Sequence, residues 1–212
     1  MAKVDTALTR MLDIDYPVIM APMFLVSNAK MIIEACNAGI AGSVPALNYR
    51  TDADFRKALD EIKASTNRAY GINLITNKSN IRLDEQLKTC LEYKVPFIIT
   101  SLGSPEQVIK ACKPLGIKVF ADVIDLAYAK KVEAMGADAI IAVNNEAGGH
   151  AGPTSPKELI TTLVKNCNIP VISAGGVGNG AQMKKMMDYG DCGLSEVTPL
   201  IASNEPPVPP ED

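Results

Sequence analysis

Residues 170–180 read PVISAGGVGNG, and this stretch indicates how the chain folds. Its first half is a continuous apolar run, which is typical of a strand buried on both faces. Its second half is a glycine-rich turn that leads into a helix candidate at residues 179–189, just before Gly190. A buried strand, a short turn and an amphipathic helix make up the repeating unit of parallel α/β folds.

The same unit recurs along the chain. Apolar runs begin at residues 17, 40, 69, 97, 118, 139, 170 and 193. Helix candidates lie between them, at residues 28–38, 52–65, 80–93, 104–113, 125–135, 155–166 and 179–189. Suitable N-caps stand at Asn28, Thr51 or Asp52, Ser104 and Ser155. Eight similar units predict a (β/α)8 TIM barrel, and a doubly wound open sheet is the alternative because periodicity does not show closure.

The last ten residues, SNEPPVPPED, contain four prolines and are not expected to form a helix. We therefore expect a single barrel domain at residues 1–205 and a proline-rich tail at residues 206–212. The barrel then lacks its final helix, or the chain is cut short after the eighth strand.

The composition excludes several classes of protein. Hydrophobic residues make up 47% of the 212 residues, which is enough for a core. The net charge of -3 and the lack of a Lys/Arg run argue against nucleic acid as a partner. No apolar run approaches the roughly 18 residues that a membrane span needs. Five cysteines without a CxxC pair argue against a disulfide framework or zinc site and favour the cytoplasm.

The turn after the seventh strand holds Gly175 and Gly176, at the end of a barrel where active sites lie. Backbone N–H groups of such a turn can converge on an anion beside a helix N-terminus. Phosphate is the expected ligand. The alternative is a tight turn that uses glycine only for its positive φ angles.

His150 is the only histidine and lies in the loop EAGGHAG after the sixth strand. A histidine in this place is a candidate general acid or base near pH 7. The alternative is an incidental surface or core residue, but the loop is too rich in glycine for core packing. No metal site is expected, because no second histidine or cysteine pair completes one.

Asn73 and Asp122 each stand at the end of an expected strand. The amide of Asn73 can hydrogen-bond the edge of a heterocycle, or it caps the turn before Thr76. Asp122 is a polar contact in the site or a cap for the helix that opens near Asp125. Position alone does not separate these alternatives.

Several motifs together resemble the nitronate monooxygenase family, formerly called 2-nitropropane dioxygenase, which also includes flavin-dependent enoyl-ACP reductases. They are PVIMAPM from Pro17, GINL from Gly71, GADAIIA from Gly136, EAGGHAG from Glu146 and PVISAGGV from Pro170. The resemblance covers roughly residues 10–205, and the order EAGGHAG then AGGV is a specific combination.

The resemblance implies an FMN-binding barrel, with the cofactor at the carboxyl ends of the strands. Backbone at Ala21, Pro22 and Met23 would lie against the isoalloxazine ring, and Asn73 would contact its polar edge. The remaining cofactor candidates are Asp122, Gly148 and Gly149 in the lining, Gly175 and Gly176 at the phosphate, and Ser195, Glu196, Val197 and Thr198 after the eighth strand. His150 matches the family histidine that acts as a base on nitroalkanes or lies beside the substrate. The implied reaction oxidises a nitronate with dioxygen, giving a carbonyl compound and nitrite.

Two features depart from the family pattern. After the eighth strand, family members commonly carry a glycine whose amide approaches the phosphate, whereas this chain has Ser195, Glu196, Val197 and Thr198. Valine at the glycine position crowds that approach, and Glu196 repels a phosphate if it points inward. Family members also continue for about a hundred further residues.

Three other functions stay open at this point. The same FMN barrel can serve an NAD(P)H-dependent reductase of enoyl-thioesters or quinones. A truncated barrel can bind flavin poorly, have little or no activity and associate into homo-oligomers through unmet apolar surface. A non-flavin barrel that handles sugar phosphates is disfavoured, since no lysine or carboxylate pair stands at the strand ends.

Overall fold

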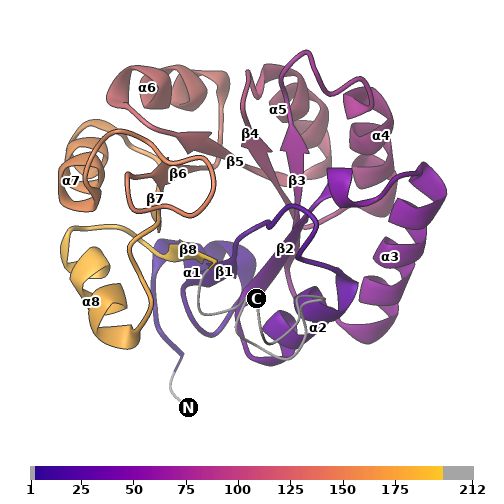
Figure 1. Cartoon of the computed structure of the whole chain (residues 1–212), viewed down its shortest axis with the longest axis horizontal. Helices are drawn as coiled ribbons and strands as arrows, with labels where there is room; N and C mark the ends of the chain where they lie inside the picture. The colour runs from indigo at the N-terminus through magenta and orange to yellow at the C-terminus, as the bar shows by residue number, and fades with distance from the viewer. Residues whose placement is uncertain (1–2, 198–212) are drawn as a thin grey trace.

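The computed structural model describes residues 3–197, whose strands form a closed parallel barrel (Figure 1). The strands follow chain order around the barrel, and β8 pairs with β1, so that Ile19 lies opposite Ser195. This closure confirms the predicted (β/α)8 barrel and excludes the open sheet. The strands are β1 (Val18–Met20), β2 (Ala41–Pro45), β3 (Tyr70–Ile75), β4 (Phe97–Ser101), β5 (Lys118–Val123), β6 (Ala139–Val143), β7 (Val171–Ala174) and β8 (Leu194–Glu196).

The helices that follow β1 to β7 surround the barrel, as Figure 1 shows. They are α2 (Ala29–Asn37), α3 (Asp52–Ser65), α4 (Leu83–Tyr93), α5 (Glu106–Cys112), α6 (Leu126–Met135), α7 (Pro156–Asn166) and α8 (Gly180–Asp188), with short 3-10 turns η1 (Ala46–Asn48) and η2 (Lys113–Leu115). Each lies within a few residues of its predicted range. No helix in residues 3–197 is both long enough and apolar enough to cross a membrane. The predictions of a missing final helix and a proline-rich tail concern residues that lie outside the described range.

Local side-chain caps explain where most helices begin. The side chains of Asn28, Thr51 and Ser155 each accept a hydrogen bond from the backbone N–H three residues later, as predicted. The predicted cap at Ser104 is displaced by one residue, because Pro105 occupies the N-cap position of α5. The hydroxyl of Ser104 still accepts a hydrogen bond from the N–H of Glu106.

The interior of the barrel is filled by side chains from alternate positions of the strands. Phe97 and Phe120 stack with their ring centroids 5.1 Å apart. Gly71 faces Phe97 so closely that any side chain at this position would overlap the ring. A large residue on β4 therefore requires a residue without a side chain on β3, and this complementarity packs the barrel centre.

A short helix that the sequence analysis missed, α1 (Ala7–Leu12), packs against the same interior cluster. Leu8, Leu12 and Ile14 are buried against residues near the starts of the strands. A capping box between Thr6 and Thr9 stabilises the start of this helix. With only six residues, α1 is too short for its hydrophobic periodicity to be recognised.

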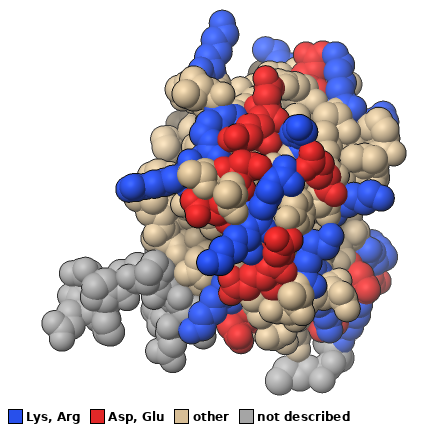
Figure 2. Space-filling model, turned by 90° about the vertical axis from the view of Figure 1, so that its right-hand side faces the viewer, with Lys and Arg blue, Asp and Glu red and all other residues tan. Residues whose placement is uncertain are grey.

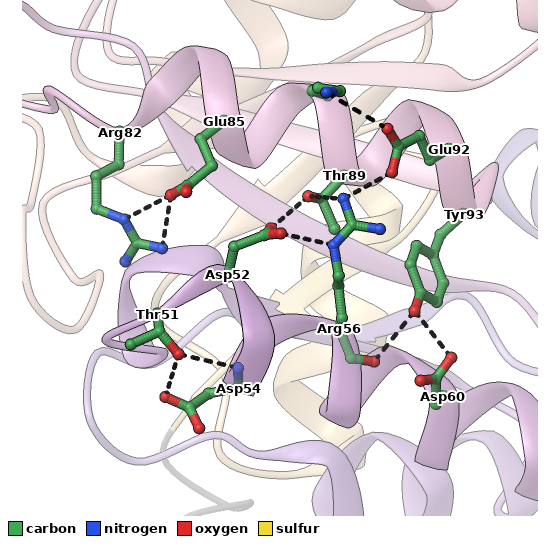
Figure 3. Close-up of polar contacts among 11 residues, drawn as sticks. Thr51, Asp52, Asp54, Arg56, Asp60, Arg82, Glu85, Thr89, Glu92 and Tyr93 are labelled. Carbon is green, nitrogen blue, oxygen red and sulfur yellow. Dashed lines mark hydrogen bonds and ion pairs between the residues drawn. The ribbon is translucent and has the colours of Figure 1, made fainter.

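The outer face of α3 and α4 carries interspersed positive and negative side chains (Figure 2). Figure 3 shows the network that joins the two helices: the Arg56 guanidinium donates to Asp52 on its own helix and pairs with Glu92 of α4 at 2.6 Å. The Thr89 hydroxyl of α4 donates to the same Asp52 carboxylate. Such a mixed-charge surface is suited to contact with water.

Two carboxylates near β8 are buried without hydrogen-bond partners among the described residues. Glu196 is 7% exposed and Asp191 is 8% exposed. Neither Oε1 of Glu196 nor either carboxylate oxygen of Asp191 has a partner in residues 3–197. Burial raises the pKa of Asp191 to about 7. Burial, with a smaller contribution from the charge of Asp191, raises the pKa of Glu196 to about 8, so this carboxyl is mostly protonated at neutral pH.

We expect Phe97→Ala to lower the free energy of unfolding by about 3–5 kcal/mol, because it opens a cavity beside Phe120 that Gly71 cannot fill. Guanidinium unfolding followed by circular dichroism measures the change. Leu115→Ala, at a residue that is 46% exposed, is the control and should change stability little. A loss below about 1 kcal/mol for Phe97→Ala would contradict the packing described above.

Glu196→Gln should reduce the pH dependence of stability. The unfolded carboxyl releases its proton near the ordinary pKa of 4.5, whereas the folded one holds it until about 8. The free energy of unfolding of the wild type therefore falls as the pH rises from 5 to 8, by an amount on the order of 3 kcal/mol for this group. Denaturation midpoints at the two pH values should show a smaller loss in the variant, where Asp191 and the other groups with raised pKa values still contribute but Glu196 does not. Equal losses in both proteins would refute the raised pKa.

Candidate active site

A cavity of about 1290 Å³ opens at the carboxyl ends of the strands. Residues from the ends of all eight strands or from the loops after them contribute to its lining. This is the end of a (β/α)8 barrel at which active sites form. The volume exceeds the roughly 300–1,000 Å³ of a pocket for one small molecule, so the cavity has room for more than one ligand.

The structure brings the sequence-predicted site residues together in the lining of this cavity. They are Ala21, Pro22, Met23, Asn73, Asp122, Gly148, Gly149, His150, Gly175, Gly176, Ser195, Glu196 and Val197. Thr198, also predicted, lies outside the described residues. The fold therefore places these residues around one cavity, and the role of each in binding or catalysis stays a prediction.

A chain of hydrogen bonds links the ends of β3, β4 and β5. The Asn73 amide nitrogen donates to the Ser101 hydroxyl at 2.7 Å, and that hydroxyl donates to Oδ2 of Asp122 at 2.6 Å. Asp125, not Asp122, caps α6, and Asp122 instead contributes to the lining of the cavity. Burial raises the pKa of Asp122 to about 6, although the hydrogen bond from Ser101 opposes the rise. The arrangement fixes the amide of Asn73, which also donates to the carbonyl of Ile99 at 3.2 Å.

Ser101 was not predicted from the sequence. Its only signal is a polar residue at the end of an otherwise apolar run, FIITS. Because the Asn73 and Asp122 side chains meet only through this hydroxyl, its role depends on the pairing of three strands.

Asn144, directly after β6, is a second residue that the sequence analysis missed. Its side chain is buried; its amide nitrogen donates to the carbonyl of Gly175 at 3.0 Å, and its oxygen accepts from the N–H of Glu146 at 2.8 Å. One side chain thus connects the loops after β6 and β7. The signal in the sequence was a pair of asparagines at the strand end, VNN, of which Asn144 is the buried one.

The turn after β7 has no room for side chains at its first two positions. Gly175 and Gly176 adopt φ angles of 106° and 83°, where other residues are strained. A Cβ atom on Gly175 would overlap the backbone nitrogen of Ala147, and one on Gly176 would overlap Oε2 of Glu146. The N–H groups of Gly176 and Val177 have no acceptor among the described residues, whereas that of Gly178 donates to Gln182. The two free donors suit an anionic group.

His150 lies exposed on the cavity lining, in the glycine-rich loop after β6. At the end of this loop, Gly152 packs directly against the carbonyl oxygen of Val143. A Cβ atom on residue 152 would overlap that oxygen, so this close contact requires glycine. Its N–H also donates to the carbonyl of Asn144 at 3.1 Å. The histidine is therefore carried on a loop whose base is anchored to β6, with its imidazole accessible to a ligand.

The rim of the cavity is apolar. Phe24, Leu102 and Ile124, from the loops after β1, β4 and β5, are exposed and contribute to the lining. Leu102 adopts a φ angle of 59°, an uncommon conformation for a residue with a side chain. A substrate that enters past this rim meets apolar surface before it reaches the polar groups below.

Comparison with known proteins identifies the family. The model of the nitronate monooxygenase family matches residues 77–211. A curated nitronate monooxygenase of Paraburkholderia phytofirmans is 29% identical and covers 94% of this chain and 67% of its own length. A 5-hydroxy-7a-methyl-1-oxo-octahydro-1H-indene-4-carboxyl-CoA dehydrogenase of Rhodococcus jostii is 27% identical, covering 99% of this chain.

The solved structure of FabK from Thermotoga maritima is similar to this chain with a TM-score of 0.92 and 32% identity. The match covers 98% of this chain and 66% of that protein. The chain spans 58% of the length of the Rhodococcus dehydrogenase. With the family model matching more than half of its residues and the barrel matching FabK, the chain belongs to the nitronate monooxygenase family.

Proposed function

We propose that this protein is an FMN-dependent oxidoreductase that oxidises alkyl nitronates with dioxygen. The observation that carries the proposal is the cavity itself. Within one large space, it contains a glycine-rich turn with two free N–H donors and an amide that Ser101 holds rigidly. A phosphate and a heterocycle edge are the ligand groups that these two features suit.

The residues present fit FMN. The N–H groups of Gly176 and Val177 would hold its phosphate, and the Asn73 amide would orient the polar edge of the ring. Backbone at Ala21, Pro22 and Met23 would lie against the ring. This segment is held in place because the Ala21 N–H donates to the carbonyl of Glu196 and the Met23 N–H donates to the Ser27 hydroxyl. When bound, FMN would supply the transfer of electrons from the nitronate to dioxygen.

His150 would handle the proton in this reaction. A neutral nitroalkane carries an acidic hydrogen on its α-carbon, and a ring nitrogen of His150 would accept it. A nitronate has already lost this proton and needs no base. The apolar rim of Phe24, Leu102 and Ile124 would exclude water from the site once a substrate is bound.

A specific observation favours a second candidate, an NAD(P)H-dependent reductase of enoyl-thioesters or quinones. The exposed apolar rim suits a substrate with a sizeable apolar group. The Rhodococcus relative is named as a dehydrogenase of a carboxyl-CoA compound. NADH oxidation with such acceptors, without turnover of nitronates, would favour this reductase over the leading proposal.

The purified protein should show flavin bands in its visible spectrum, or acquire them on addition of FMN, because the cavity offers both a ring site and a phosphate site. Heat release followed by chromatography identifies the flavin, and we expect close to one FMN per chain. Gly176→Val, which places a branched side chain into the turn, should abolish retention. A colourless protein that takes up no FMN would refute the proposal and favour a barrel with little or no activity.

His150→Ala should leave FMN binding intact and lower turnover of neutral nitroalkanes by roughly 10²–10⁴-fold, the range of general base catalysis. Turnover of preformed anionic nitronates should fall much less, since they need no deprotonation. Oxygen uptake with the two forms of one compound measures the difference, and the nitronate serves as the internal control. An equal loss on both forms would show that His150 binds the substrate instead.

A further inference from the structure

Glu196 is a carboxyl group at the end of β8, the strand that pairs with β7, and it lines the same cavity as the glycine turn that follows β7. Side chains alternate sides along a strand, so Glu196 lies on the same side of β8 as Leu194. Leu194 packs with Met186 of α8, whose methyl group lies beside Gly176. Glu196 therefore stands on the side of the strand that faces the glycine turn, and it contributes to the lining of the cavity.

This carboxyl is buried and has nothing to neutralise it. It is 93% buried as a residue, and its Oε1 has no hydrogen-bond partner among the described residues. The strands paired with β8, which are β1 and β7, carry no titratable side chain. The charge that acts on Glu196 is acidic, that of Asp191 before the strand, and a second carboxylate, that of Glu146, lies against Gly176.

Lysine and arginine are scarce around this end of the cavity. In the described part of the lining, Lys131 of α6 is the one such residue, and it follows β5, not β7 or β8. Of the two lysines of α8, Lys184 is occupied by Asp188 at 3.1 Å, and Lys185 is exposed and lies outside the cavity lining. A buried carboxyl without a cation is stable only in its neutral form. A neutral carboxyl is a hydrogen-bond donor.

We propose that Glu196 binds the phosphate of FMN as a neutral carboxylic acid, through its O–H group, so that retention of FMN requires this proton. The inference rests on the flavin-binding function proposed above. A phosphate dianion needs donors, and the turn supplies two N–H groups, to which Glu196 adds a third. Once ionised, the same carboxylate loses its donor and repels the dianion. The binding of riboflavin, which has no phosphate, does not depend on the protonation of Glu196.

The test is the affinity for FMN and for riboflavin at pH 7 and pH 9, measured by quenching of flavin fluorescence. The phosphate is ionised at both pH values, since its second pKa is about 6. If only the protonated carboxyl accepts FMN, the dissociation constant of the wild type rises about tenfold over this interval. The riboflavin constant stays unchanged and corrects for any other group that titrates.

Three variants separate the effect of Glu196 on FMN affinity from the effects of other carboxylates. Glu196→Gln keeps a permanent donor in the same shape, so FMN should bind with wild-type affinity at pH 7 and lose nothing at pH 9. Glu146→Gln removes the other carboxylate and should keep the full pH dependence. Glu34→Gln, at an exposed residue of α2 outside the cavity lining, matches the change in net charge and should behave as the wild type. Thermal unfolding confirms that each variant is folded.

An FMN affinity of the wild type that is equal at both pH values would overturn the inference, as would a pH dependence that persists in Glu196→Gln. Either result leaves the flavin function standing. If neither flavin binds to any of the proteins, both proposals are wrong. Proton-linked binding of FMN without turnover of nitronates would support the inference and contradict only the nitronate reaction.

Discussion

The pairing of β8 with β1 is the interaction on which the rest of the structure depends. Because these two short strands meet, the eight strands become one closed barrel, and the carboxyl ends of all eight gather at one end. The closure extends beyond the strands, since the N–H of Ala21 donates to the carbonyl of Glu196 at 2.8 Å. The first and last parts of the described chain are thereby joined at the floor of the cavity. Without the pairing of β8 with β1, the segment around Pro22 and the glycine turn would not line the same cavity.

The cavity combines rigid and side-chain-free parts, and each depends on packing elsewhere. Asn73 is rigid because Ser101 and Asp122, on the next two strands, hold its amide. The turn at Gly175 stays open because Asn144 connects it to the preceding loop. Polar groups that are buried and fully paired orient a ligand at little further cost in entropy. Glu196 is the exception, since it is buried and unpaired, and such a group is expected where a ligand is to be bound.

The positions of most strands and helices could be predicted to within a few residues, because strands, caps and glycine turns are local features. Thr51 and Ser155 cap the helices that follow them, as their positions indicated. The sequence analysis missed α1, since six residues carry too little periodicity. It placed a cap at Ser104, where Pro105 takes the position. It also left Asp122 undecided between a helix cap and a site residue, because its hydrogen-bond partner lies on another strand.

The sequence by itself determined the order of the strands and helices, the positions of the glycine turns and the loops that hold His150 and Gly176. These follow from local hydrophobic periodicity and from the backbone freedom of glycine. Only the tertiary structure decided that the sheet closes, that Ser101 joins Asn73 to Asp122 and that Asn144 connects two loops. It also decided that Glu196 is buried without a partner. Burial and hydrogen-bond pairing depend on segments that are distant along the chain, so they exist only once those segments have packed together.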